Sequence, residues 1–273
     1  MSNVGVAFDK AAAEGRAALI GYLPAGFPTV DTGIEAALAM VRSGADIVEI
    51  GLPYTDPLMD GPVIQEAVHR ALVGGTRVHD VLRTVEAVAS AGVPVLVMTS
   101  WNPVDRYGVD RFAADLAAAG GAGLITPDIT PDEGTPWCEA AAAHDLDAVF
   151  LAAISSTSDR LARIAAACRG FVYAASLMGV TGERDSVGGG AEDLVARIRE
   201  HTSLPIAVGL GVRDGAQAAQ VARFADGVIV GSAFVRRLLD ADDPGTGIAG
   251  VADLAAELAA GVRTRAPSAA TPS

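Results

Sequence analysis

The sequence predicts a (β/α)₈ TIM barrel. Short runs rich in β-branched residues alternate along the 273-residue chain with longer, alanine-rich amphipathic segments. This alternation predicts parallel strands joined by crossover helices, and such a barrel typically needs about 250 residues. An open, doubly wound sheet is the structural alternative. The eight predicted strands are residues 18–22, 47–50, 93–98, 123–126, 148–151, 171–174, 206–208 and 227–230.

Amphipathic helices are predicted between these strands. No internal linker interrupts the alternation, so we expect one domain over residues 1–265. The last residues, 266–273, are rich in Ala, Pro, Ser and Thr, and we expect them to be a disordered tail. The predicted helices include residues 32–42, 109–119, 159–169, 192–200, 215–222 and a short one at 233–239.

The composition argues against several classes of partner. A formal net charge of −13 disfavours binding to nucleic acid or to an anionic membrane surface. The first ten residues lack the apolar core of a signal peptide, and no apolar run reaches the roughly 20 residues of a membrane span. Cys138 and Cys168 have no paired spacing and are expected to be reduced thiols. We therefore expect a cytoplasmic enzyme.

Basic and metal-binding side chains are sparse where catalysis is expected. Lys10 is the only lysine and precedes the first predicted strand, which disfavours a lysine Schiff base inside the barrel. The four histidines show no two-histidine spacing on one strand or helix face. We therefore expect neither a metal nor a cofactor.

Glu49 is the first candidate catalytic residue. Strand alternation places it on one face with Ile47 and Gly51, while the apolar Val48 and Ile50 face the helices. Glu49 then points into the barrel near its catalytic end, where loss of water raises a carboxyl pKa and favours general acid–base catalysis. The alternative is a structural glutamate whose oxygens are satisfied by backbone donors.

Asp56 and Asp60 follow in a loop with several prolines. Asp60 stands just before a helix expected to begin near Pro62, so capping of that helix and catalysis are equally good interpretations. Asp56, taken alone, is a turn residue.

Glycine-rich turns follow the last two predicted strands. Gly209 and Gly211 follow one, and Gly231 with Ser232 follows the other, directly before a short helix. Glycine lets the backbone approach a ligand closely, and a helix N-terminus binds anions. Barrels often place a phosphate at this position. The alternative is a pair of plain tight turns.

Two segments carry a resemblance to a known family. Residues 49–61 hold a strand Glu, a Pro, an Asp-Pro and an Asp-Gly in the order and spacing of the tryptophan synthase alpha family, and residues 173–182 are similar to its sixth strand and loop. The resemblance runs from Tyr22 to Ser232. It implies cleavage of indole-3-glycerol phosphate to indole and D-glyceraldehyde 3-phosphate, a lyase step of tryptophan biosynthesis. It also implies that Glu49 is the general acid–base and that Asp60 binds the indole N–H.

The same resemblance implies further site residues. Tyr173 would lie near the glycerol chain, and Thr181 would close towards Asp60. Other substrate contacts are implied for Tyr22, Ser100, Ile125 and Asp128. The implied phosphate site comprises Gly182, Gly211, Gly231 and Ser232.

A partner is implied as well. The loop containing Pro53 and Asp56 resembles the partner-facing surface of the family, which implies a pyridoxal-phosphate beta subunit in an alpha2beta2 heterotetramer. Ser100 stands where the family commonly has Tyr, and Thr130 where it usually has Pro.

The chemistry suits the residues that are present. A retro-aldol cleavage needs an electron sink, and protonation of indole C3 makes the substrate its own sink. Two carboxylates in different surroundings, Glu49 and Asp60, can divide this work. The alternatives are a stand-alone lyase that releases free indole, a weakly active regulatory subunit, and another phosphate-binding barrel enzyme such as an isomerase.

Overall fold

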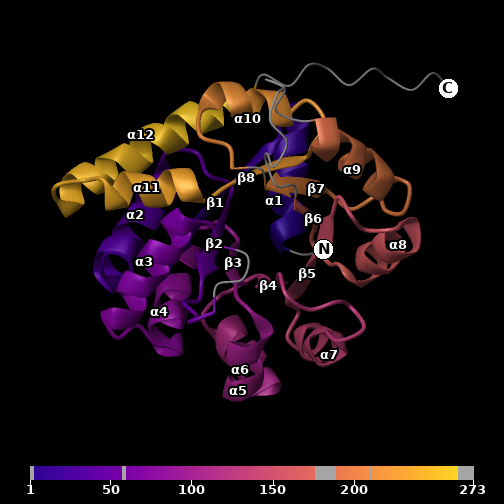
Figure 1. Cartoon of the computed structure of the whole chain (residues 1–273), viewed down its shortest axis with the longest axis horizontal. Helices are drawn as coiled ribbons and strands as arrows, with labels where there is room; N and C mark the ends of the chain where they lie inside the picture. Colours follow the sequence, from indigo (N-terminus) through magenta and orange to yellow (C-terminus); the bar gives the residue numbers. More distant parts are fainter. Residues whose placement is uncertain (1–2, 57–59, 176–188, 210, 264–273) are drawn as a thin grey trace.

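The computed structural model describes residues 3–56, 60–175, 189–209 and 211–263. Eight parallel strands close into a barrel in the order of the sequence, with helices around it (Figure 1). This confirms the predicted TIM barrel, and the open-sheet alternative is wrong. The predicted tail 266–273, Thr181 and Gly182 lie outside the described residues. The strands are β1 (Ala18–Pro24), β2 (Ile47–Gly51), β3 (Val95–Met98), β4 (Gly123–Thr126), β5 (Asp147–Ala153), β6 (Val172–Ala175), β7 (Ile206–Gly209) and β8 (Gly227–Val230).

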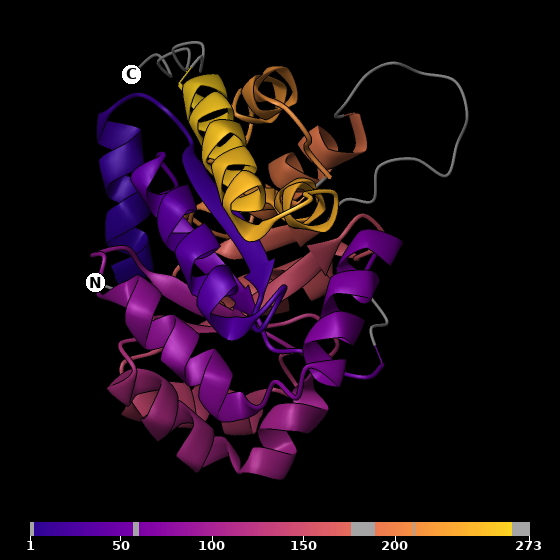
Figure 2. The ribbon, with the colours of Figure 1, turned by 90° about the vertical axis from the view of Figure 1, so that its left-hand side faces the viewer.

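The helices form the outer layer. All predicted helices are present with small shifts of their ends, and others were not predicted individually. The last helix, α12, packs against both α2 and α10 and closes the layer (Figure 2). The helices are α1 (Asn3–Ala13), α2 (Val30–Arg42), α3 (Pro62–Val73), α4 (Val78–Ala89), α5 (Trp101–Tyr107), α6 (Val109–Ala118), α7 (Thr135–Ala143), α8 (Ser158–Ala167), α9 (Gly189–Arg199), α10 (Gly215–Val221), α11 (Ser232–Leu239) and α12 (Pro244–Val262).

The inside of the barrel is a separate apolar cluster. Ile20, Ile47 and Ile229 lie in it together with Val4 and Phe8 of α1. A Cβ added to the first residue of β8 would lie 2.9 Å from the Phe8 ring. The first helix therefore closes the barrel interior at its amino-terminal end, so a site inside the barrel lies at the carboxyl ends of the strands.

Other sequence predictions concern the cysteines and membrane spans. Cys138, in α7, and Cys168, which directly follows α8, are both free thiols, as expected. In the part of the chain that the structure describes, no helix combines the length and apolar character needed to cross a membrane.

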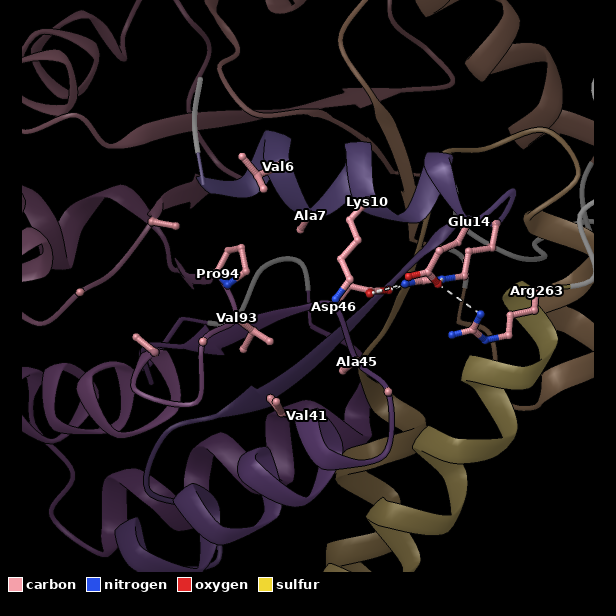
Figure 3. A pocket seen from close by; sticks show the side chains of 16 residues that line it. Val6, Ala7, Lys10, Glu14, Val41, Ala45, Asp46, Val93, Pro94 and Arg263 are labelled. Carbon is pink, nitrogen blue, oxygen red and sulfur yellow. Dashed lines mark hydrogen bonds and ion pairs between the residues drawn. The ribbon is translucent and has the colours of Figure 1, made fainter.

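A cavity of about 620 Å³ opens at the amino-terminal end of the barrel, beside α1 (Figure 3). Apart from Lys10, the charged side chains that line it pair with one another. The Arg16 guanidinium is 5 % exposed and donates to Asp46 at 2.6 and 2.8 Å and to Glu14 at 2.7 Å. Arg263 lies 3.2 Å from the same Glu14. These contacts join the segment before β1 to the segment before β2 and to the end of α12, which indicates a stabilising role.

Replacing Asp46 with alanine should therefore destabilise the fold strongly. The change leaves the buried Arg16 charge without its bidentate partner, which typically costs about 3–5 kcal/mol. Urea unfolding should show this loss in the free energy of unfolding. Asp132 is the matched control, because it pairs with Arg163 at 2.9 Å where both side chains are mostly exposed. Asp132→Ala should cost less than about 1 kcal/mol, and equal losses would contradict the account.

Candidate active site

Glu49 lies in the middle of β2, opposite Tyr22 of β1, and its side chain is completely buried. Neither carboxylate oxygen has a hydrogen-bond partner among the described residues. Burial raises the pKa of this carboxyl to about 8. The structure thus disfavours a glutamate satisfied by backbone donors and shows an unpaired acid inside the barrel.

Two tyrosines share this environment. Tyr22 is 7 % exposed, and Tyr173 lies on β6. Burial raises the pKa of both hydroxyls, and the charges of Asp60 and Glu49 raise each pKa further. Because a charge shifts the pKa of another group only when the two are near each other, the two carboxyls and the two tyrosines lie close together at the carboxyl end of the barrel.

Small residues at the barrel mouth make room for the tyrosines. A Cβ at Gly51 would lie 2.3 Å from the Tyr22 hydroxyl, and one at Gly209 would lie 2.6 Å from the Tyr173 hydroxyl. Both glycines are therefore required by close packing inside the barrel rather than by a turn. From the sequence, Gly51 was placed on the inward face and Gly209 in a glycine-rich turn, but neither glycine was connected with the space that a tyrosine ring needs.

Asp60 stands between β2 and α3 and is half-buried. The residue that caps α3 is Gly61, which has no side-chain capping bond, so the capping interpretation of Asp60 is not what the structure shows. Its backbone carbonyl accepts a hydrogen bond from Gln65 Nε2 at 2.7 Å, whereas its carboxylate has no partner in the described ranges. Burial raises the pKa of this carboxyl as well.

The glycine turns lie at the ends of β7 and β8, as predicted. Gly211 has a φ of +69°, which favours glycine. Gly231 precedes α11, and its carbonyl accepts from the N–H groups of Phe234 and Val235. The N–H groups of Ser232 and Ala233 come before these bonds, at the positive end of the helix dipole. This end of the helix can therefore bind an anion.

The residues predicted on β3 and β4 take different positions. Ile125 is buried inside the barrel and lies opposite Met98. Ser100 caps α5 without a side-chain hydrogen bond. Both carboxylate oxygens of Asp128 accept a hydrogen bond from the Trp101 backbone N–H at the start of α5, each at 3.0 Å. Asp128 therefore joins the loops after β3 and β4, and its contact with substrate stays a prediction.

The first part of the loop after β2, residues 52–56, runs from the inside of the molecule to its surface. Pro53 is buried and Asp56 is exposed. Between them, the Tyr54 hydroxyl accepts a hydrogen bond from Asn102 Nδ2 at 2.8 Å, which ties the loop to α5. The partner-facing role of this loop stays a prediction.

Together these features define a class of protein: a (β/α)₈-barrel enzyme with buried carboxyl groups suited to acid–base catalysis at the carboxyl ends of its strands. The particular family follows from comparison. The chain belongs to the tryptophan synthase alpha chain family, whose sequence profile matches residues 8–263.

Individual relatives support this assignment over nearly the whole chain. The tryptophan synthase alpha chain of Streptomyces coelicolor is 62 % identical, and the match covers 97 % of this chain and 99 % of the relative. That of Salinispora arenicola is 60 % identical over 97 % of this chain and its own full length. A crystal structure of tryptophan synthase from M. tuberculosis has a TM-score of 0.89 at 53 % identity and covers 96 % of this chain and 99 % of its own.

Proposed function

We propose that this chain cleaves indole-3-glycerol phosphate by a retro-aldol reaction to indole and D-glyceraldehyde 3-phosphate, in tryptophan biosynthesis. The observation that carries the proposal is Glu49, a fully buried and unpaired carboxyl inside the mouth of the barrel, with Asp60 nearby. Membership of the tryptophan synthase alpha chain family supports the same lyase reaction. A cytoplasmic location is part of this proposal.

The reaction balances with these two carboxyls. With a pKa of about 8, Glu49 is mostly protonated at neutral pH and can donate a proton to indole C3. This proton makes an indolenine whose C=N bond accepts electrons. The Glu49 carboxylate left by this step takes the proton of the glycerol hydroxyl next to the ring; the carbon–carbon bond then breaks, an aldehyde forms, and the electron pair restores the indole ring. Asp60 holds the N1–H throughout.

The test is steady-state formation of indole by the isolated protein from indole-3-glycerol phosphate. The proposal expects indole and triose phosphate in equal amounts. An isomerised product would indicate another phosphate-binding barrel enzyme, and binding without turnover would indicate a regulatory subunit.

The phosphate end of the substrate should depend on the turn after β8. A Cβ at Gly231 would already lie 3.2 Å from the Tyr22 ring, so valine there should fill the space in front of the α11 N-terminus. We expect Gly231→Val to raise KM at least about tenfold and to abolish competition by glycerol 3-phosphate. Gly74→Ala, at the far end of α3, is the control, and it should keep the wild-type KM and the competition by glycerol 3-phosphate. Unchanged competition in folded Gly231→Val would remove the phosphate from this turn.

We further propose that a pyridoxal-phosphate beta subunit binds the loop containing Pro53 and Asp56, in an alpha2beta2 heterotetramer. This loop leads directly to Asp60, so a partner that stabilises one arrangement of it can shift the site towards its active form. A saturating cognate beta subunit should raise indole production about 10- to 100-fold, which needs only about 1.4–2.8 kcal/mol. No binding, together with high activity alone, would instead indicate a stand-alone indole-producing lyase.

A further inference from the structure

A groove of about 810 Å³ lies outside the barrel mouth, beside the proposed phosphate turn. It is bounded by α3, α11 and α12, and α11 lies between the other two (Figure 1). Gly61, which follows Asp60, and Ser232, the first residue of α11, both line it. The groove therefore lies next to Asp60 on one side and next to the turn before α11 on the other.

Three arginines line this groove against a single acidic residue, Asp240. Arg213 stands two residues after Gly211, and Arg236 and Arg237 lie on α11. All three are exposed, and their guanidinium groups form no ion pair or hydrogen bond with any residue that the structure describes. The stem of Arg237 rests on α12, where a Cβ added to Gly250 would lie 3.5 Å from it.

The groove gathers three such arginines in one place, whereas some arginines elsewhere on the surface have an acidic partner. Arg70 and Arg83, on other helices, are each paired with a carboxylate at 2.7 and 2.6 Å. The chain as a whole has a formal net charge of −13, so its average field repels an anionic substrate. Unpaired guanidinium groups gathered at one groove oppose that repulsion locally, and they retain their capacity to bind an anion.

We propose that Arg213, Arg236 and Arg237 form an anion-collecting groove that draws the phosphate monoester of the substrate to the turn before α11. The proposal rests on the proposed function for the identity of the substrate. The arginines attract the phosphate group of the substrate and help to hold it, but they do not contact the atoms that react. They should therefore change KM and the affinity for phosphate esters, and leave kcat unchanged.

The test compares two double variants that remove the same charge. Arg236→Gln with Arg237→Gln neutralises the groove. Arg42→Gln with Arg223→Gln is the control, since both arginines are exposed and lie at the amino-terminal end of the barrel, where Arg42 ends α2 and Arg223 follows α10. The probes are glycerol 3-phosphate, which is dianionic, and indole, which is neutral. For each protein, the equilibrium affinity for the two probes is measured at several salt concentrations. The kcat and KM for indole-3-glycerol phosphate are measured at the same salt concentrations.

We expect the groove variant to bind glycerol 3-phosphate about three- to tenfold more weakly at low salt, with a matching rise in KM. The difference should disappear near 1 M salt, where the Debye length is about 3 Å. Binding of indole should be unchanged, and the control should lose less than about twofold. Arg213→Gln alone should show a smaller loss of the same kind.

Three results would overturn the inference: equal losses in both double variants, a loss that persists at high salt, or a fall in kcat without a change in KM. If wild-type protein fails to cleave indole-3-glycerol phosphate but its groove variant still loses affinity for glycerol 3-phosphate, the proposed function fails while the groove stands. If the wild type cleaves the substrate and neither variant changes KM, the groove alone fails.

Discussion

Replacing Glu49 with glutamine should lower the turnover of indole-3-glycerol phosphate at least about 100-fold, with a smaller effect on KM. Glutamine keeps the shape of the side chain but can neither give nor take the proton at C3. Among the described residues, Glu49 is the one buried carboxyl group that faces the barrel interior without a hydrogen-bond partner. Steady-state kinetics of the two proteins decides the matter, and a variant with most of the wild-type turnover would refute the assignment.

The raised pKa of Glu49 predicts how stability depends on pH. The folded pKa of about 8 lies above the ordinary value of 4.5, so the folded protein holds a proton that the unfolded chain releases between these values. The contribution of Glu49 to stability is therefore fully present below about pH 4.5 and is lost as pH rises through about 8. Glu49→Gln should thus gain melting temperature relative to wild type as the pH rises. A constant difference across this range would show that the pKa is not raised.

Replacing Asp60 with asparagine should also lower turnover, by at least about 100-fold, because an amide is a weaker acceptor for an N–H that becomes more acidic in the reaction. The melting temperature should stay close to that of wild type, since Gly61 occupies the capping position of α3 and Asp60 makes no capping bond. A loss of about 0.5–2 kcal/mol of stability with normal kinetics would instead return Asp60 to a capping role.

The alternation of strand and helix patterns predicted the eight strands of the barrel. Some of the features that it did not predict depend on contacts between elements far apart in the sequence. The β-branched runs located all eight strands, although β1 continues to Pro24 and β5 extends at both ends. Helices such as α1 and α12 were not predicted, because runs of alanine and glycine carry little periodic contrast between apolar and polar faces. The position of α1 under the barrel is a tertiary contact that no local pattern encodes.

The site was predictable to the extent that it lies on one strand. Alternation alone placed Glu49 inside the barrel. The link between Asp128 and the Trp101 N–H joins two loops 27 residues apart in sequence and needs the closed barrel. The capping interpretation of Asp60 could be set aside only when Gly61 was seen at the capping position of α3. The groove arginines lie on two separate elements and become one surface only after folding.

The most direct test of the central claim follows the proton itself. A single turnover of indole-3-glycerol phosphate in D₂O is quenched, and the products are analysed by mass spectrometry and NMR. If Glu49 delivers a solvent-exchanged proton to the ring, wild-type protein should give triose phosphate and an equal amount of indole that carries one deuterium at C3, and Glu49→Gln should give neither within the same time. Indole without deuterium at C3, or full product formation by Glu49→Gln, would contradict the account.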